Sequence, residues 1–147
     1  MRNLSTCQKL ANIIGGEVIQ AKPVCVVMRL RDIKATILNR RTRSPLALPF
    51  ALSFENNGLN LGESVVLQKE INPFMMALQK RGLIVTAVHN HWLFDEPRLM
   101  YMHWENAEKW IPLSLLEIVL KQQKKQVCSK SDTIYSVFRH DKTSALR

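Results

Sequence analysis

The fold is decided by residues 83–104, which read LIVTAVHNHWLFDEPRLMYMHW. This stretch begins with an apolar run rich in β-branched residues. It then passes through a polar segment around residues 93–97 and ends in a second apolar run. The pattern predicts two strands joined by a turn. Three of the four histidines of the chain fall inside this predicted hairpin.

The register of the hairpin decides whether the histidines meet. Side chains alternate between the two faces of a strand, so a turn centred on residue 94 or 95 places the odd-numbered residues of both strands on one face. His89, His91 and His103 then lie together. We expect His103 opposite Ala87 or Val85. A slip of one residue would send His103 to the other face.

Three imidazoles and a carboxylate of the turn make this hairpin a candidate metal site. Neutral imidazole and carboxylate donors suit zinc, manganese, iron or nickel. An open coordination position on such an ion would allow it to activate a water molecule. The predicted metal ligands are His89, His91, Glu96 and His103.

Three further residues of the hairpin, Asn90, Arg98 and Tyr101, are expected to contact a bound ligand. Arg98 has the forked donors that orient a small anion. The alternative is a binding or interaction protein without enzymatic activity, in which the histidines bond only to their neighbours and the hairpin presents a rigid recognition surface. The sequence leaves open which of the two holds, and with it whether the protein is an enzyme.

Length and composition indicate one globular domain. The 147 residues are 46% apolar and 22% charged, which is ordinary for a folded domain. No run of apolar residues is long enough for a transmembrane helix. We expect a single domain over residues 1–126 and a basic, flexible tail over residues 127–147.

The net charge of +9 is unevenly placed. Residues 29–43 hold six basic residues against one acidic residue, and residues 109–147 hold eight against three. Such segments attract a small anionic ligand, an acidic partner, an acidic lipid surface or nucleic acid. Nucleic acid is the weakest of these candidates, because no aromatic residues are interleaved with Arg40, Arg41 and Arg43. The simpler alternative is that the charge only keeps the protein soluble.

The cysteines and the N-terminus predict a reduced, cytoplasmic protein. Cys7, Cys25 and Cys128 are odd in number, widely spaced and without a CxxC motif. Cys25 lies in an apolar run and is expected to be a small core residue. The first residues carry no apolar segment typical of a signal peptide.

Hydrophobic periodicity and turn signals predict an α+β fold, with an antiparallel or mixed sheet and helices packed on one face. The second helix is expected to be capped by Asn72. Helices are predicted over residues 5–14, 70–81 and 113–126, and strands over residues 17–20, 24–30, 35–38, 50–55, 61–67, 83–89 and 99–104.

Several of these segments resemble the LppY/LpqO domain, a family named after lipoproteins. The resemblance covers roughly residues 10–121 and implies that the His-Asn-His turn, Glu-Pro-Arg and the later histidine form the signature surface of the family. It implies no reaction. The segments that carry it are EINPFMMAL at 70–78, GLIVTAVHNH at 82–91, EPR at 96–98 and MYMH at 100–103.

Overall fold

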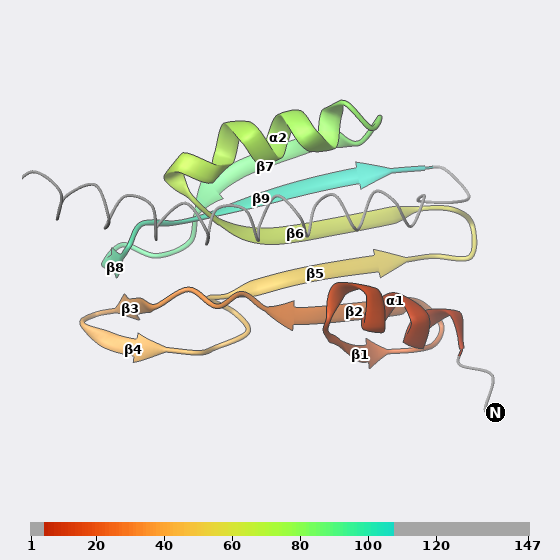
Figure 1. Cartoon of the computed structure of the whole chain (residues 1–147), viewed down its shortest axis with the longest axis horizontal. Coiled ribbons are helices and arrows are strands. Elements are labelled where there is room, and N and C mark those ends of the chain that lie inside the picture. The colour runs from red at the N-terminus through yellow and green to blue at the C-terminus, as the bar shows by residue number, and fades with distance from the viewer. Residues whose placement is uncertain (1–4, 108–147) are drawn as a thin grey trace, which may run out of the picture.

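The structure, a computed structural model, describes residues 5–107. Within these residues the chain forms two antiparallel sheets and two helices of nine residues each (Figure 1). The larger sheet has the strand order β1-β2-β5-β6-β9-β7, and the smaller sheet has the order β4-β3-β8. The elements are α1 (Thr6–Ile14), β1 (Glu17–Gln20), β2 (Cys25–Leu30), β3 (Ala35–Ile37), β4 (Arg40–Thr42), β5 (Pro49–Phe54), β6 (Asn60–Leu67), the 3₁₀ helix η1 (Gln68–Glu70), α2 (Ile71–Gln79), β7 (Ile84–Asn90), β8 (Asp95–Glu96) and β9 (Leu99–Asn106).

The predicted fold class, α+β with helices packed on one face of a sheet, is wrong. The described part of the chain is mostly antiparallel β-sheet, with nine strands and only two short α-helices. Short connections between successive strands favour antiparallel pairing. Two strands were not predicted: β4 lies in the expected basic loop, and β8 lies in the expected turn. The helix predicted over residues 113–126, the domain boundary at residue 126 and the tail lie outside the described residues.

Each helix has a recognisable beginning. Ser5 caps α1, because its Oγ accepts a hydrogen bond from the Gln8 N–H at 3.2 Å, and Gly15 ends the helix with a φ of 66°. The start of α2 differs from the prediction. Asn72 lies inside the helix, which begins at Ile71, directly after the 3₁₀ turn η1.

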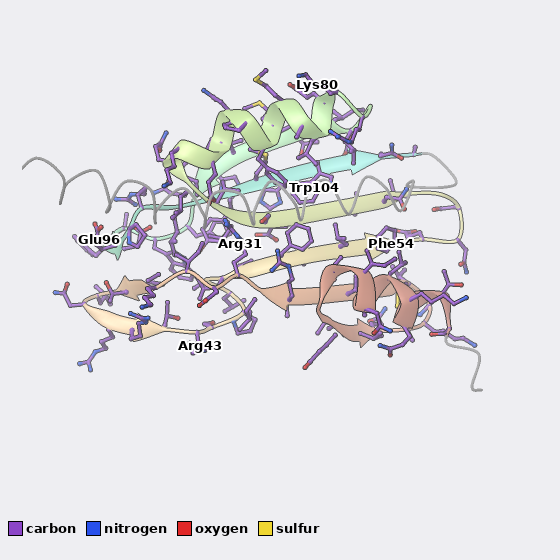
Figure 2. All side chains as sticks on the ribbon, in the orientation of Figure 1. Arg31, Arg43, Phe54, Lys80, Glu96 and Trp104 are labelled. Atoms are coloured by element: carbon purple, nitrogen blue, oxygen red, sulfur yellow. A yellow bond between two sulfur atoms is a disulfide. The ribbon has the colours of Figure 1, made fainter. Side chains whose placement is uncertain are left out.

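Two hydrophobic cores hold the sheets and helices together. The first joins α1 and α2 to the larger sheet, and Trp104 belongs to it (Figure 2). The Trp104 ring is edge-on to Phe74, with 5.4 Å between ring centroids. Gly62 lies opposite Trp104 on β6, and a Cβ atom there would overlap the indole. The second core joins the two sheets. Its buried members are Ala35, Ala47, Leu48, Val65, Leu99 and Tyr101.

A buried ion pair fixes the end of β2 to the start of α2. Arg31 donates from Nη1 to Glu70 Oε2 at 2.6 Å and from Nη2 to Oε1 at 3.1 Å. Burial by itself raises the pKa of Glu70, but the hydrogen bonds and charge of Arg31 outweigh it and hold this pKa below its usual value. Arg31 also donates to the carbonyl of Val65 at 2.9 Å. The basic segment 29–43 is therefore not one continuous charged surface.

Cys7 and Cys25 form a disulfide between α1 and β2, with 5.6 Å between their Cα atoms. The prediction of reduced cysteines is wrong for this pair. The two residues are 18 positions apart, in a helix and in a strand, so no local spacing motif indicates the bond. No helix within residues 5–107 is long and apolar enough to cross a membrane.

Candidate metal centre

The hairpin of β7 and β9 has the register that brings the histidines to one face. His103 lies opposite Ala87, and His89 lies opposite Tyr101. An irregularity between Val85 and Ala87 shifts the register once along the strand. Of the two partners expected for His103, Ala87 and Val85, the structure has Ala87.

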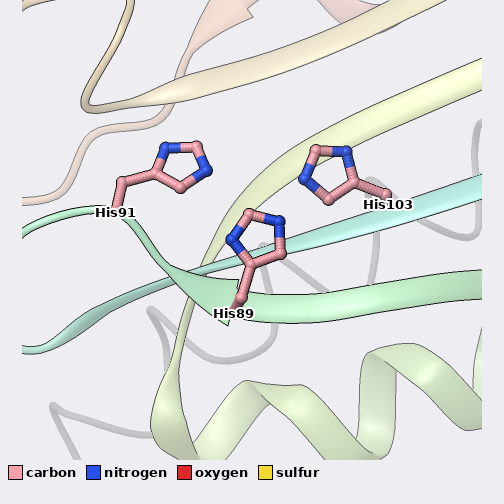
Figure 3. A group of neighbouring side chains, drawn as sticks. All are labelled: His89, His91 and His103. Carbon is pink, nitrogen blue, oxygen red and sulfur yellow. The ribbon is translucent and has the colours of Figure 1, made fainter.

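The three imidazoles converge above β7 and β9, on the side of the hairpin away from α2 (Figure 3). One ring nitrogen from each of His89, His91 and His103 lies within 4.8 Å of the others. Ligands at about 2.1 Å from a tetrahedral metal are roughly 3.4 Å apart, so small side-chain rotations close the remaining gap. His89 and His91 are exposed, which leaves room for these rotations.

The electrostatics favour a neutral imidazole at His91. Although His91 is exposed, one face of its ring packs on Tyr101, and this partial desolvation, followed by the neighbouring His89, lowers the pKa of His91 below its ordinary value; the charge of Glu63 opposes this effect. A neutral ring offers the nitrogen lone pair that a metal needs. At neutral pH His91 is therefore ready to act as a ligand.

Tyr101 supports His91 from below. The two rings are parallel within 3° and their centroids are 3.7 Å apart. Tyr101 is fully buried, and its hydroxyl donates to the carbonyl of Ala47 at 2.8 Å and accepts from Trp92 Nε1 at 2.6 Å. Burial is the main reason that the pKa of Tyr101 is raised to about 12. Tyr101 therefore holds the His91 ring in place from the buried side, whereas the sequence analysis predicted that it contacts the ligand.

Two more of the predicted site residues, Arg98 and Asn90, stabilise the segment between β7 and β9 through hydrogen bonds. Arg98 donates from Nη1 to the carbonyl of Trp92 at 2.8 Å and pairs with Asp95 Oδ1 at 2.7 Å. Asn90 Nδ2 donates to the same Trp92 carbonyl at 3.3 Å. Arg98 thus has its nearest partners inside the loop.

Glu96, the predicted carboxylate ligand, is not brought to the histidines. It lies on β8 and pairs with Thr36 in the smaller sheet. The carboxylate beside the cluster is Glu63, which lies opposite His103 on β6, with its Oε1 3.9 Å from His103 Nε2. No pattern in the sequence indicates Glu63, because its position depends on a strand pairing across some forty residues.

A shallow groove of about 230 Å³ adjoins the cluster on the same face of the larger sheet. It is lined by Ala51 and Ser53 of β5, by Val26 of β2 and by Leu61 of β6. Glu63 and His103 also line it. A small ligand lying in the groove would therefore contact His103, one of the three histidines of the cluster.

Comparison with known proteins gives a family without an assigned activity. Residues 8–116, which include every residue of the site, match the family described as Domain of Unknown Function (DUF1259). No match was found among curated proteins or among solved structures. The narrower name LppY/LpqO is not confirmed by this match.

Proposed function

The chain belongs to the family described as Domain of Unknown Function (DUF1259), and we propose that it binds a divalent transition metal ion through His89, His91 and His103. One observation carries the proposal: three imidazole nitrogens lie within 4.8 Å of one another on one sheet face. Two of these histidines come from β7 and the loop after it, and the third comes from β9, so a bound ion would bridge the hairpin.

Three protein ligands are the number found in catalytic zinc sites, where an open position remains for water or substrate. Glu63 Oε1 lies 3.9 Å from His103 Nε2, and we propose that it moves closer on metal binding and accepts a hydrogen bond from this ring, as the carboxylates around metal-bound histidines commonly do. Zinc, iron, manganese and nickel all accept this donor set. We propose that the groove beside the cluster admits a small ligand, and that an anionic group of this ligand takes the open position.

We propose none of the remaining predicted contacts for a bound ligand. Asn90 follows His89 on β7, so its side chain lies on the opposite face of the strand, where it donates to the Trp92 carbonyl. Glu96 and Arg98 are also engaged away from the cluster. On the segments quoted above, we also propose the narrower kinship with the LppY/LpqO domain.

A second candidate function, a binding protein without metal, is favoured by one observation. The rings of His89 and His103 are stacked, with 11° between their planes and 5.0 Å between centroids. Stacked rings are typical of packing, whereas ligation turns the nitrogens of each ring toward a shared point. In this alternative the same face recognises a partner directly.

The disulfide supports an oxidising compartment. Disulfides persist in secreted and envelope proteins and are rare in the reducing cytosol. We therefore propose that Cys7 and Cys25 form their bond outside the cytoplasm, in place of the cytoplasmic location that the sequence predicted.

Elemental analysis of untagged protein tests the metal proposal. We expect close to one zinc, iron, manganese or nickel ion per chain in the wild type, and none in a folded His89→Ala/His91→Ala/His103→Ala variant. His140→Ala removes the remaining histidine of the sequence and serves as the matched control, so it should keep the ion. A wild-type protein that stays free of metal after incubation with all four ions would contradict the proposal. So would a triple variant that retains its metal.

A further inference from the structure

Three large apolar side chains are exposed at one end of the smaller sheet, and we call Leu38, Leu93 and Phe94 the apolar tip. Their exposed fractions are 64%, 79% and 68%. Leu38 lies in the turn between β3 and β4, and the other two lie in the loop before β8 (Figure 1). The Leu38 N–H donates to the Phe94 carbonyl at 2.9 Å, so the two loops are held side by side.

The backbone conformation of the β3–β4 turn does not favour a leucine at position 38. Leu38 and Asn39 have φ values of 51° and 60°, as both central residues of a two-residue hairpin turn often do. Glycine or asparagine adopts this conformation easily, whereas leucine is strained in it. Because the Leu38 side chain is exposed, burial does not offset the strain. A strained, exposed leucine at a turn points to a role outside the fold.

Basic side chains flank the apolar tip. Arg40 and Arg41 are exposed on β4, opposite Ile37 and Thr36 of β3, and Arg43 follows them. Figure 2 shows Arg43 at this sheet. The two carboxylates of β8 offset this charge only in part: Asp95 is buried and paired with Arg98, so Glu96 alone on this strand faces the three arginines from an exposed position. The surface is therefore apolar at its tip and positively charged beside it.

We propose that the apolar tip inserts into the headgroup region of an anionic lipid bilayer, with Arg40 and Arg41 contacting lipid phosphates. Exposed apolar groups on a basic surface match this partner, because the membrane interface offers both an apolar layer and negative charge. The side chains stand on two loops held together by a hydrogen bond, and such exposed loop tips suit insertion into lipid. His91 lies two residues before Leu93, so docking would hold the histidine cluster near the membrane surface. This proposal does not depend on a bound metal.

Vesicle co-sedimentation of the full chain tests the proposal. We expect binding to phosphatidylcholine vesicles that contain phosphatidylglycerol, and weaker binding to phosphatidylcholine alone. The variant Leu38→Gly/Leu93→Ser/Phe94→Ser should bind at least about tenfold more weakly, since three apolar side chains no longer enter the lipid. Glycine is chosen at Leu38 because it fits the positive φ.

The contribution of the arginines to vesicle binding is recognised by its dependence on salt. Arg40→Gln and Arg41→Gln should each weaken binding about fivefold at low salt, and the difference should shrink as salt screens the charges. Loss that is independent of salt would argue against a phosphate contact and overturn this part of the proposal.

A matched control removes apolar groups of similar exposure elsewhere. Ile84 and Met76 are 59% and 54% exposed, and the variant Ile84→Thr/Met76→Ser should bind vesicles as the wild type does. The proposal is overturned if the wild type does not sediment with anionic vesicles at low salt, or if control and tip variants lose binding equally. Self-association that the tip variant abolishes, seen by light scattering, would assign the tip to a protein contact.

Discussion

Replacing Tyr101 by phenylalanine tests whether this residue stabilises the fold around the candidate site without binding the metal itself. The substitution keeps the ring that lies 3.7 Å from His91 and removes only the hydroxyl. Two hydrogen bonds are lost, to the Ala47 carbonyl and from Trp92 Nε1. An unpaired buried polar group costs about 1–3 kcal/mol, so we expect the free energy of unfolding to fall by roughly 2–4 kcal/mol.

Urea denaturation followed by tryptophan fluorescence measures this loss, and cobalt titration measures metal affinity. The folded Tyr101→Phe variant should bind cobalt within about threefold of the wild type, because the stack on His91 remains, and this small change corresponds to less than 1 kcal/mol. Trp92→Phe breaks only one of the two hydrogen bonds and should cost about 1 kcal/mol. Tyr101→Leu removes the ring and should weaken cobalt binding further.

Two results would refute this reasoning. A Tyr101→Phe protein with the urea midpoint of the wild type would show that the hydroxyl does not stabilise the joint between the sheets. A protein that keeps its stability but no longer binds cobalt would show that the hydroxyl acts on the metal site itself and not only as a support.

Three other substitutions and titrations follow from the packing and the charges. Gly62→Ala forces a methyl group into the indole of Trp104, and should lower the free energy of unfolding by about 1–3 kcal/mol in urea denaturation. Glu70→Gln leaves Arg31 buried without its counter-ion and should cost about 3–5 kcal/mol at pH 7. Because the pKa of Glu70 is lowered in the folded state, its stabilisation is complete above the unfolded value, about 4.3, and is lost as pH falls through the folded pKa. The stability gap between wild type and Glu70→Gln should therefore begin to narrow as pH falls below the unfolded value, about 4.3, and a gap that stays constant would contradict the assignment. Cobalt affinity should fall at acid pH, because a metal binds only neutral imidazole, and the lowered pKa of His91 keeps this ring available to a lower pH than an ordinary histidine; pH-independent affinity would exclude these ligands.

The sequence predicted the hairpin well, because its side-chain alternation is local and strong. Residues 84–90 and 99–106 became strands in the expected register, and the three histidines met as that register requires. The period-two pattern contains this information without reference to the rest of the chain.

Features that depend on distant partners were missed or misjudged. Glu63 reaches His103 only because β6 pairs with β9, and β8 exists only because β3 lies beside it. The disulfide likewise joins elements that no spacing rule connects. The fold class was wrong for a related reason: β4 and β8 are two or three residues long, too short for any periodicity to appear.

Because β7 lies at the edge of the larger sheet, a metal bound by the histidine cluster would also affect the stability of this edge. In the described part of the chain β7 is an edge strand, hydrogen-bonded only to β9. An open edge frays and offers its backbone to other strands. A cation bound by His89 and His91, at the end of β7, and by His103, on β9, would cross-link the edge strand to its neighbour in the sheet. Amide protons of β7 should then exchange more slowly when the ion is present, and the loaded protein should resist strand-mediated aggregation on heating.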